Sequence, residues 1–358
     1  MIRFHRNIGL GAATVVCLVL SSASGAETIT RRGDKPVSGD VTGSSRLEVT
    51  IKVKNPKEET VAIPANQIQN IAWTGESPEA NLARSDEAAG RYQKALDGYA
   101  KALQASKSTN PLAKLDLEYN SLRTTARMAL ADSSRAGEAI KRLEEFRKAQ
   151  SDHYRSFESQ SLLGQLYLSQ KDFVKAQLAF DALAKAPWRD TQLEAKIFTG
   201  RLLQASNKFD EAAAAYEAII TEQAANPQEE ALRQEALLGK SRVLLAQKNF
   251  VEAQKLLELV VENVDSDDSR IQAEAYVRLG DSLREQGKDK DALLAYLHVD
   301  VLFPSEKMLQ AEALFHLTRL WDRIGQKGRA ADARDKLEGE EFRNTEWARQ
   351  LKAPAAGG

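Results

Sequence analysis

Apolar and polar residues recur with a helical period over most of the chain, most clearly in residues 273–304. Two apolar stripes, each with three- and four-residue spacing, are made by Tyr276, Leu279, Leu283, Ala292, Tyr296 and Val299. A break around Gly287 separates the two stripes, and Pro304 ends the second. The small residues Gly280 and Ala292 allow two helix backbones to cross closely. This segment therefore predicts two helices joined by a turn.

The same arrangement recurs along the chain, as an alanine with fixed neighbours. The alanines are Ala95, Ala139, Ala176, Ala212, Ala253, Ala292 and Ala330. In six of the seven units a small residue stands twelve positions earlier: Ala83, Gly164, Gly200, Ser241, Gly280 or Thr318. In the same number of units a large residue follows four positions later: Tyr99, Leu143, Phe180, Tyr216, Leu257 or Tyr296. At the last unit this position is Arg334, which predicts an end unit that faces solvent.

These residues resemble the signature of the tetratricopeptide repeat, a helical hairpin of about 34 residues. The alanine spacing here is longer, from 36 residues (Ala176 to Ala212) to 44 residues (Ala95 to Ala139). The resemblance implies a mainly α fold, an α-α superhelix of about seven hairpins over residues 76–351, with a solvating helix within residues 341–351. It also implies a concave face, lined by the first helix of each hairpin, that holds an extended peptide or another protein.

Residues 27–75 have a different pattern, with short alternating segments between Gly and Pro turns. A turn is expected at residues 33–36, and residues 46–53 give the clearest strand, with Leu47, Val49 and Ile51 on one face. The residues Gly33, Gly39, Ile63-Pro64 and Ile68-x-x-Ile71 resemble a small module that precedes repeats in some exported bacterial proteins. The prediction is a small all-β, barrel-like module of SH3-like or Sm-like type that caps the first repeat or docks a partner.

The first 26 residues have the order of a secretory signal peptide. Basic residues precede an apolar run at 8–20, and small residues follow at 21–26. The apolar run has 13 residues, too few for the roughly 20 of a spanning helix, so cleavage is favoured over an uncleaved anchor. Cleavage would remove the single cysteine, Cys17, and with it disulfide and thiol chemistry. The expected location is therefore exported, either periplasmic or secreted.

Charge and motifs argue against nucleic-acid binding and against the common catalytic sites. The chain has 50 Lys and Arg residues and 51 Asp and Glu residues, and no dense basic run that would suit a nucleic acid. The histidines have no zinc-site spacing, and Walker A, GxSxG and GxGxxG sequences are absent. Adjacent carboxylates such as Glu144 and Glu145 point apart on a helix. We therefore expect no enzyme, no cofactor and no metal, although residues distant in sequence could still assemble a site.

Positions in the first helices predict a partner groove. Its expected residues are an apolar stripe and a broken basic row: Ile197, Arg201, Leu238, Arg242, Val277, Asp281, Phe315 and Arg319. One turn earlier lies an acidic row: Glu158, Glu194, Glu235, Glu274 and Glu312. Two interpretations remain open. The arginines either form a ladder of ion pairs with the glutamates of neighbouring helices, or they hold carboxylate groups of a partner.

These patterns together predict four segments and one general role. The segments are a signal peptide (1–26), the β module (27–75), the repeat array with its final helix (76–351) and a disordered tail (352–358). The expected role is a non-enzymatic scaffold or adaptor of the cell envelope that binds another protein or an extended peptide and needs no membrane contact after cleavage. The alternative is a structural protein that assembles with copies of itself.

Overall fold

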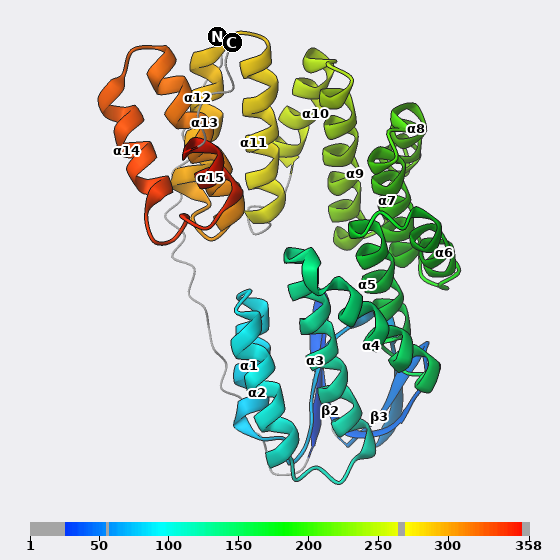
Figure 1. Cartoon of the computed structure of the whole chain (residues 1–358). Coiled ribbons are helices and arrows are strands. Elements are labelled where there is room, and N and C mark those ends of the chain that lie inside the picture. Colours follow the sequence, from blue (N-terminus) through cyan, green and yellow to red (C-terminus); the bar gives the residue numbers. More distant parts are fainter. Residues whose placement is uncertain (1–25, 55–56, 264–268, 353–358) are drawn as a thin grey trace.

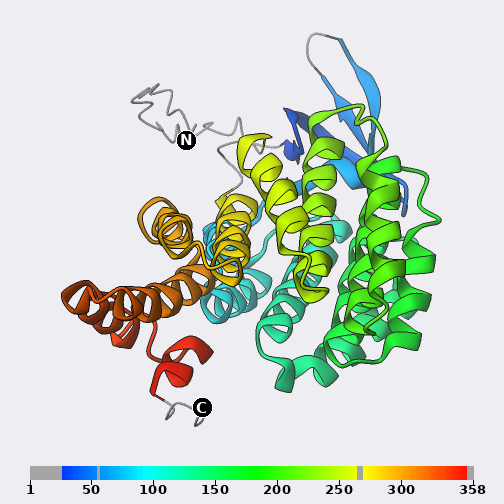
Figure 2. The same cartoon turned by 90° about the horizontal axis from the view of Figure 1, so that it is seen from above.

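The structure is a computed structural model that describes residues 26–54, 57–263 and 269–352. A small β-sheet precedes a long series of helices, which stack in sequence order along a curved path (Figures 1 and 2). The predicted fold class is confirmed. The signal peptide, apart from Ala26, and the tail, apart from Lys352, lie outside the described residues, so these two predictions remain predictions.

The helices α1 to α14 form seven consecutive hairpins, as expected for the array. They are α1 (Pro78–Ala88) with α2 (Tyr92–Ala105), α3 (Pro111–Ala131) with α4 (Ala136–Ala149), α5 (Ser156–Ser169) with α6 (Phe173–Leu183), α7 (Arg189–Ala205) with α8 (Phe209–Ile220), α9 (Pro227–Ala246) with α10 (Phe250–Asn263), α11 (Ser269–Glu285) with α12 (Asp289–Leu302), and α13 (Lys307–Arg323) with α14 (Lys327–Glu338). A 3₁₀ turn, η2 (Ser133–Arg135), precedes α4.

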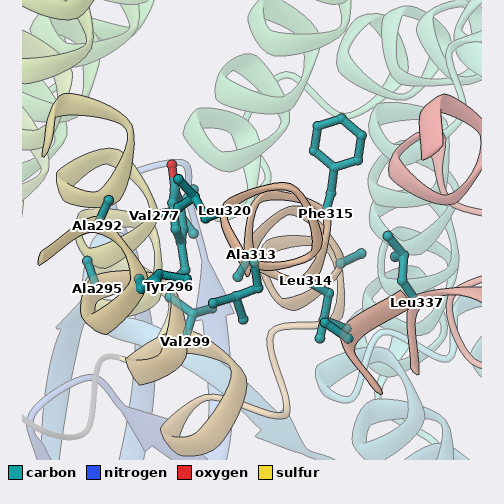
Figure 3. Packing of buried hydrophobic residues seen from close by; sticks show 14 of the residues in the cluster. Val277, Ala292, Ala295, Tyr296, Val299, Ala313, Leu314, Phe315, Leu320 and Leu337 are labelled. Atoms are coloured by element: carbon teal, nitrogen blue, oxygen red, sulfur yellow. The ribbon is translucent and has the colours of Figure 1, made fainter. Parts of the chain in front are cut away.

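The repeated alanines lie in the interior of the array. All seven are buried, with at most 2% of their surface exposed, and Arg334 is exposed as predicted. The need for a small residue at position 280 comes from one side chain rather than from the crossing of two backbones. A Cβ atom on Gly280 would lie 2.6 Å from the Tyr296 ring, which is fully buried against α11. Figure 3 shows Tyr296 and Val299 packing toward Ala313 and Leu314 of the next hairpin.

The hairpin turns share a backbone feature that the sequence pattern did not reveal. Five residues before the repeated alanine, the backbone has a positive φ in six of the seven hairpins. The residues are Gly90, Lys171, Asn207, Lys248, Gly287 and Gly325. A left-handed residue is a common way to end an α-helix, because the amide groups that follow can satisfy its last carbonyls. Only half of these positions are glycine, so composition alone does not identify them.

The β module is a five-stranded antiparallel sheet with the order β4-β3-β2-β1-β5. Its elements are β1 (Glu27–Arg31), β2 (Asp34–Ser44), β3 (Glu48–Val53), β4 (Glu59–Pro64), the 3₁₀ turn η1 (Ala65–Gln67) and β5 (Ile68–Ala72). Ile29, Val49 and Ile51 fill its core. Two local predictions were wrong. Leu47 precedes β3 and is 42% exposed, and the first turn is shorter than residues 33–36, because β2 already starts at Asp34.

The last helix is also shorter than predicted. The expected solvating helix at 341–351 begins only at Glu346, as α15 (Glu346–Lys352), after irregular backbone. Phe342 is nevertheless buried, and Trp347 packs on Phe315 of α13 with ring centroids 5.2 Å apart. The expected packing of both aromatic residues against the array is confirmed.

Candidate partner-binding cleft

A cleft of about 510 Å³ lies where the β module meets the first helices of the array. We call it the junction cleft. It is lined by the turn after β1, by η1 and β5, and by α5, α7, α9 and α11. Its lining includes Arg32, Asn66, Tyr154, Arg155, Phe157, Glu158, Ser161, Gln165, Trp188, Asp190, Glu194, Ile197, Arg201, Gln228, Glu235 and Arg270. Two parts of the chain that are separate in sequence therefore build one site.

The side chain of Arg155 fastens the β module to the array at one wall of the cleft. Its guanidinium donates to the backbone carbonyls of Ile68 and Gln69 in β5, both at 3.1 Å, and to Glu158 Oε2 at 3.0 Å. It is 4% exposed and lies over the Tyr154 ring, 4.7 Å from the centroid. Because three acceptors hold one planar group, the position of β5 relative to α5 is fixed.

A buried carboxylate continues this contact toward α3. Asp116, with no exposed surface, accepts hydrogen bonds from the Trp73 indole N–H at 3.1 Å and from the Tyr154 hydroxyl. Trp73 follows β5, and Tyr154 belongs to the loop before α5. The β module, α3 and the loop before α5 therefore share one polar network. The hydrophobic core of the β module also includes Ala113 of α3.

Burial acts in the same direction on two carboxyl groups of the cleft, but their charged neighbours differ. Burial opposes ionisation of Glu158, but Arg155 and Arg123 outweigh this effect and lower its pKa to about 2. Burial raises the pKa of Glu194, and the hydrogen bond from Ser161 offsets this only in part. Glu158 is therefore an ionised, ion-paired group, whereas Glu194 has its charge poorly compensated.

The lining of the cleft also includes an aromatic pair and amide contacts. Phe157 and Trp188 meet edge to face, with ring centroids 5.2 Å apart. Asn66 of η1 and Gln228 of α9 both donate to Asp190 Oδ2, at 2.8 and 3.0 Å. An aromatic surface beside fixed polar groups is the usual composition of a recognition pocket.

The acidic and basic rows predicted from the sequence form an ion-pair ladder between successive first helices. Arg201 of α7 pairs with Glu235 of α9, and Arg242 pairs with Glu274 of α11 at 3.3 Å. At the next step the arginine comes one turn earlier in the helix, and Arg278 pairs with Glu312 of α13 at 2.7 Å. The interpretation as a structural ladder is thus supported for Arg201 and Arg242, while partner binding at the predicted groove stays a prediction.

The eight predicted groove residues are distributed over different environments. Ile197 and Arg201 line the junction cleft. Leu238 and Val277 are fully buried between helices, and Phe315 is 3% exposed beneath Trp347, so the expected apolar stripe belongs to the helix packing. The remaining three lie farther along the array, at Arg242, Asp281 and Arg319. Sequence reasoning missed Arg32, Asn66 and Trp188, which lie outside the helices that it considered.

A second hollow, of about 720 Å³, continues the concave face toward the C-terminal end. Arg242 and Asp281 line it, together with Trp347 of α15 and His316 of α13. His316 stacks on Tyr296 and lies 3.6 Å from Asp281 Oδ1. Burial lowers the pKa of His316 to about 4, so the ring is neutral at pH 7. Exposed Arg319 stacks on Phe315 and has no ion pair with another described residue.

The described residues contain no group of three or more His, Asp, Glu or Cys side chains arranged to hold a metal ion. No helix within the described ranges is long and apolar enough to cross a membrane.

Comparison with known proteins identifies the repeats. Residues 128–190 and 199–269 match the family model of the tetratricopeptide repeat. The comparison with curated proteins found no match.

Several solved structures are similar at low sequence identity. BtubC from P. vanneervenii is 18% identical (TM-score 0.46; 65% of this chain and 95% of that chain covered). PilW, described as a type IV pilus biogenesis factor, is 17% identical (TM-score 0.47; 68% and 100% covered). A tetratricopeptide repeat protein from Parabacteroides merdae is also 17% identical (TM-score 0.48; 76% and 95% covered). Within residues 128–190 and 199–269, the helical hairpins are tetratricopeptide repeats.

Proposed function

We propose that this chain is an exported, non-enzymatic adaptor of the cell envelope that holds an extended segment of another protein in the junction cleft. The observation that carries the proposal is the cleft itself, with its aromatic pair and its incompletely matched charges on the concave side of the repeats. Repeat arrays commonly use this face for extended partners. The proposal of export rests on the order of basic, apolar and small residues in the first 26 positions.

Site-specific photo-crosslinking tests the adaptor role. A photoreactive residue is placed at position 188 in the cleft and, as a matched control, at Val174, which is 73% exposed on the outer helix α6. Crosslinking is carried out in the cell envelope of the source organism. A discrete protein adduct at position 188 that is absent at position 174 is the expected result. Equal adducts at both positions, or none at position 188, would remove the support for this role.

The proposal of export is tested by the intact mass of the protein. If the signal peptide is cleaved, the exported chain begins near Glu27 and lacks Cys17, and its formal charge becomes 48 − 51 = −3, because Arg3 and Arg6 are lost. The intact mass of the protein recovered from the envelope gives the start directly. A mass that still includes residues 1–25 would favour a membrane tether instead.

We propose further that the β module is an SH3-like or Sm-like barrel that serves as a wall of the cleft. The long strand β2 supports this type, because it pairs with β1 through its first half and with β3 through its second half. The register shifts between Val41 and Gly43, where a bulge bends the strand. In this arrangement the module caps the array and also supplies Arg32 and Asn66 to the site.

A specific observation favours self-assembly as the second candidate. Val301, Leu302 and Met308 flank the turn between α12 and α13 and are 56–66% exposed. Exposed apolar residues close together are typical of contact surfaces. Sedimentation of the exported chain at increasing concentration separates the two roles. A monomer throughout favours the adaptor, whereas growth in mass that is lost in Val301→Ser/Leu302→Ser favours self-assembly.

A further inference from the structure

The ion-pair ladder gives three residues of the acidic row a basic partner on the preceding first helix. Glu235, Glu274 and Glu312 are paired in this way with Arg201, Arg242 and Arg278. The three carboxylates have 9–18% of their side-chain surface exposed, so each is largely withdrawn from water. Withdrawing a carboxylate from water is tolerated when a cation compensates it. Each acidic position in the row is therefore expected to need a compensating cation nearby.

One step of the ladder lacks its cation, and it lies inside the junction cleft. Glu194 of α7 belongs to the same acidic row, but the preceding first helix, α5, contains no lysine or arginine. Gln165 occupies the position of α5 that corresponds to Arg201 and Arg242. Its amide points back to Ser161, with contacts of 3.2 Å to Oγ and 3.4 Å to the carbonyl.

The remaining partners of Glu194 do not replace the missing cation. Ser161 Oγ donates to Glu194 Oε1 at 3.0 Å, and Glu194 has no ion pair with another described residue. Arg201 and Arg270 are both engaged with Glu235, and Arg155 with Glu158. Among the nearby charges Arg32 favours the ionised form of Glu194, and Glu235 and Glu158 oppose it. Among the five described glutamates of this row, Glu194 is therefore the one without an ion pair to another described residue.

We propose that a lysine or arginine side chain of the partner segment enters the junction cleft and completes the ladder by pairing with Glu194. This inference rests on the proposed function and specifies the partner's chemistry at that same site. The cleft volume of about 510 Å³ falls within the roughly 300–1,000 Å³ of ordinary ligand pockets. An apolar residue next to the basic one would lie against Phe157 and Trp188, since the same cleft holds both features.

Two substitutions isolate this contact. Gln165→Arg supplies the missing guanidinium from α5 itself, in the manner of Arg201 and Glu235, and should block the cleft for a basic side chain. Glu194→Gln removes the charge and keeps the shape. Gln93→Arg is the matched control, because it adds the same charge at an exposed position of the remote helix α2.

The probes are capped nonapeptides of Leu, Ala and Ser with a central lysine, norleucine or glutamate, titrated calorimetrically into the full exported chain. The lysine peptide should bind at least about tenfold more tightly than the norleucine peptide. Gln165→Arg and Glu194→Gln should each abolish this difference, and Gln93→Arg should preserve it. Gln165→Arg should also raise the denaturation midpoint, which shows that it folds and pairs.

The outcomes separate this inference from the adaptor role. Equal binding of the lysine and norleucine peptides, or no binding of either up to about 1 mM, overturns the inference. So does a lysine preference that survives Gln165→Arg. If position 188 still crosslinks to a protein in these cases, the adaptor role stands without the ladder contact. The loss of that crosslink, by contrast, is a failure of the proposed function itself.

Discussion

Glu158 and Glu194 occupy equivalent positions in successive repeats, yet their neighbours give them opposite electrostatics. Arg155 and Arg123 flank Glu158, whereas Glu194 has only a serine hydroxyl within hydrogen-bonding distance. Burial acts on both groups, so the difference comes from the charged neighbours. A single repeat position can therefore be structural in one unit and available for binding in the next.

The first prediction uses this contrast in the pH dependence of stability. The pKa of Glu158 is about 2 in the folded chain, below its ordinary value of about 4.3. Its stabilising contribution is therefore complete above about pH 4.3 and is lost as the pH falls toward 2. Glu158→Gln should cost roughly 2–4 kcal/mol at pH 7 and progressively less on acidification. Denaturant unfolding at a series of pH values measures this.

Glu194→Gln should behave in the opposite way. Because the folded-state pKa of Glu194 is raised, its ionisation lowers stability at neutral pH, and that penalty vanishes once the group is protonated in both states. The substitution should raise the free energy of unfolding at pH 7 and have a smaller effect near pH 3. Destabilisation by Glu194→Gln at pH 7 would contradict this account of its surroundings.

The second prediction concerns the arginines, which are not equivalent. Arg201→Glu would face Glu235 across a partly buried helix contact, and we expect a loss of roughly 1–3 kcal/mol. Arg319→Glu removes an exposed cation that stacks on Phe315 and should cost at most about 1 kcal/mol. Thermal unfolding compares them. The charge swap Arg201→Glu/Glu235→Arg should recover much of the loss, and no recovery would mean that the pair is not the cause.

At the scale of the element, the hairpin depends on the aromatic ring that lies under a glycine. Gly280→Leu should cost roughly 1–3 kcal/mol, because the Tyr296 ring occupies the space that any side chain would need. Gly137→Ala is the control, since no atom beyond its chain neighbours and the adjacent backbone of helix α4 lies within 4 Å of its Cβ position. That change should be neutral or slightly stabilising. Equal denaturant midpoints for both variants would disprove the packing argument.

The helices could be predicted from the sequence because their signal is local. The alanine at each hairpin contact and the large residue four positions later lie on one helix face, so a single helix carries the pattern. Two misses share a physical reason. Leu47 belongs to an alternating pattern that starts before β3 does, and α15 starts late because Phe342 is buried by irregular backbone rather than by a helix turn. Tertiary contacts, which sequence periodicity does not reveal, determine where β3 and α15 begin.

At the scale of the whole molecule, the binding site could not be predicted in the same way. Its acidic and basic rows were predictable because they follow the repeat. The junction cleft, however, also needs Arg32 and Asn66 from the β module and Trp188 from the loop before α7. Only the docking of the module on α3 and α5 brings these residues together. Sequence spacing contains no signal for a contact between residues more than a hundred positions apart.

The last prediction follows from this docking. Because Arg155 and Asp116 join β5, α3 and α5 in one buried network, these elements should open together, whereas repeats farther along couple mainly to their neighbours. Arg155→Lys keeps the charge but loses the planar donor group, and we expect a cost of roughly 2–4 kcal/mol.

Native-state hydrogen exchange shows which elements lose stability in Arg155→Lys. The slowest amides of β5 and of α3 should lose protection by the same amount in Arg155→Lys, while those of α13 stay unchanged. Arg135→Lys, at a side chain that is 54% exposed, is the control and should leave all three elements unchanged. If only β5 loses protection, the module opens independently of the array. The junction cleft would then be a contact between two separate folding units, and its geometry would change whenever the module opens.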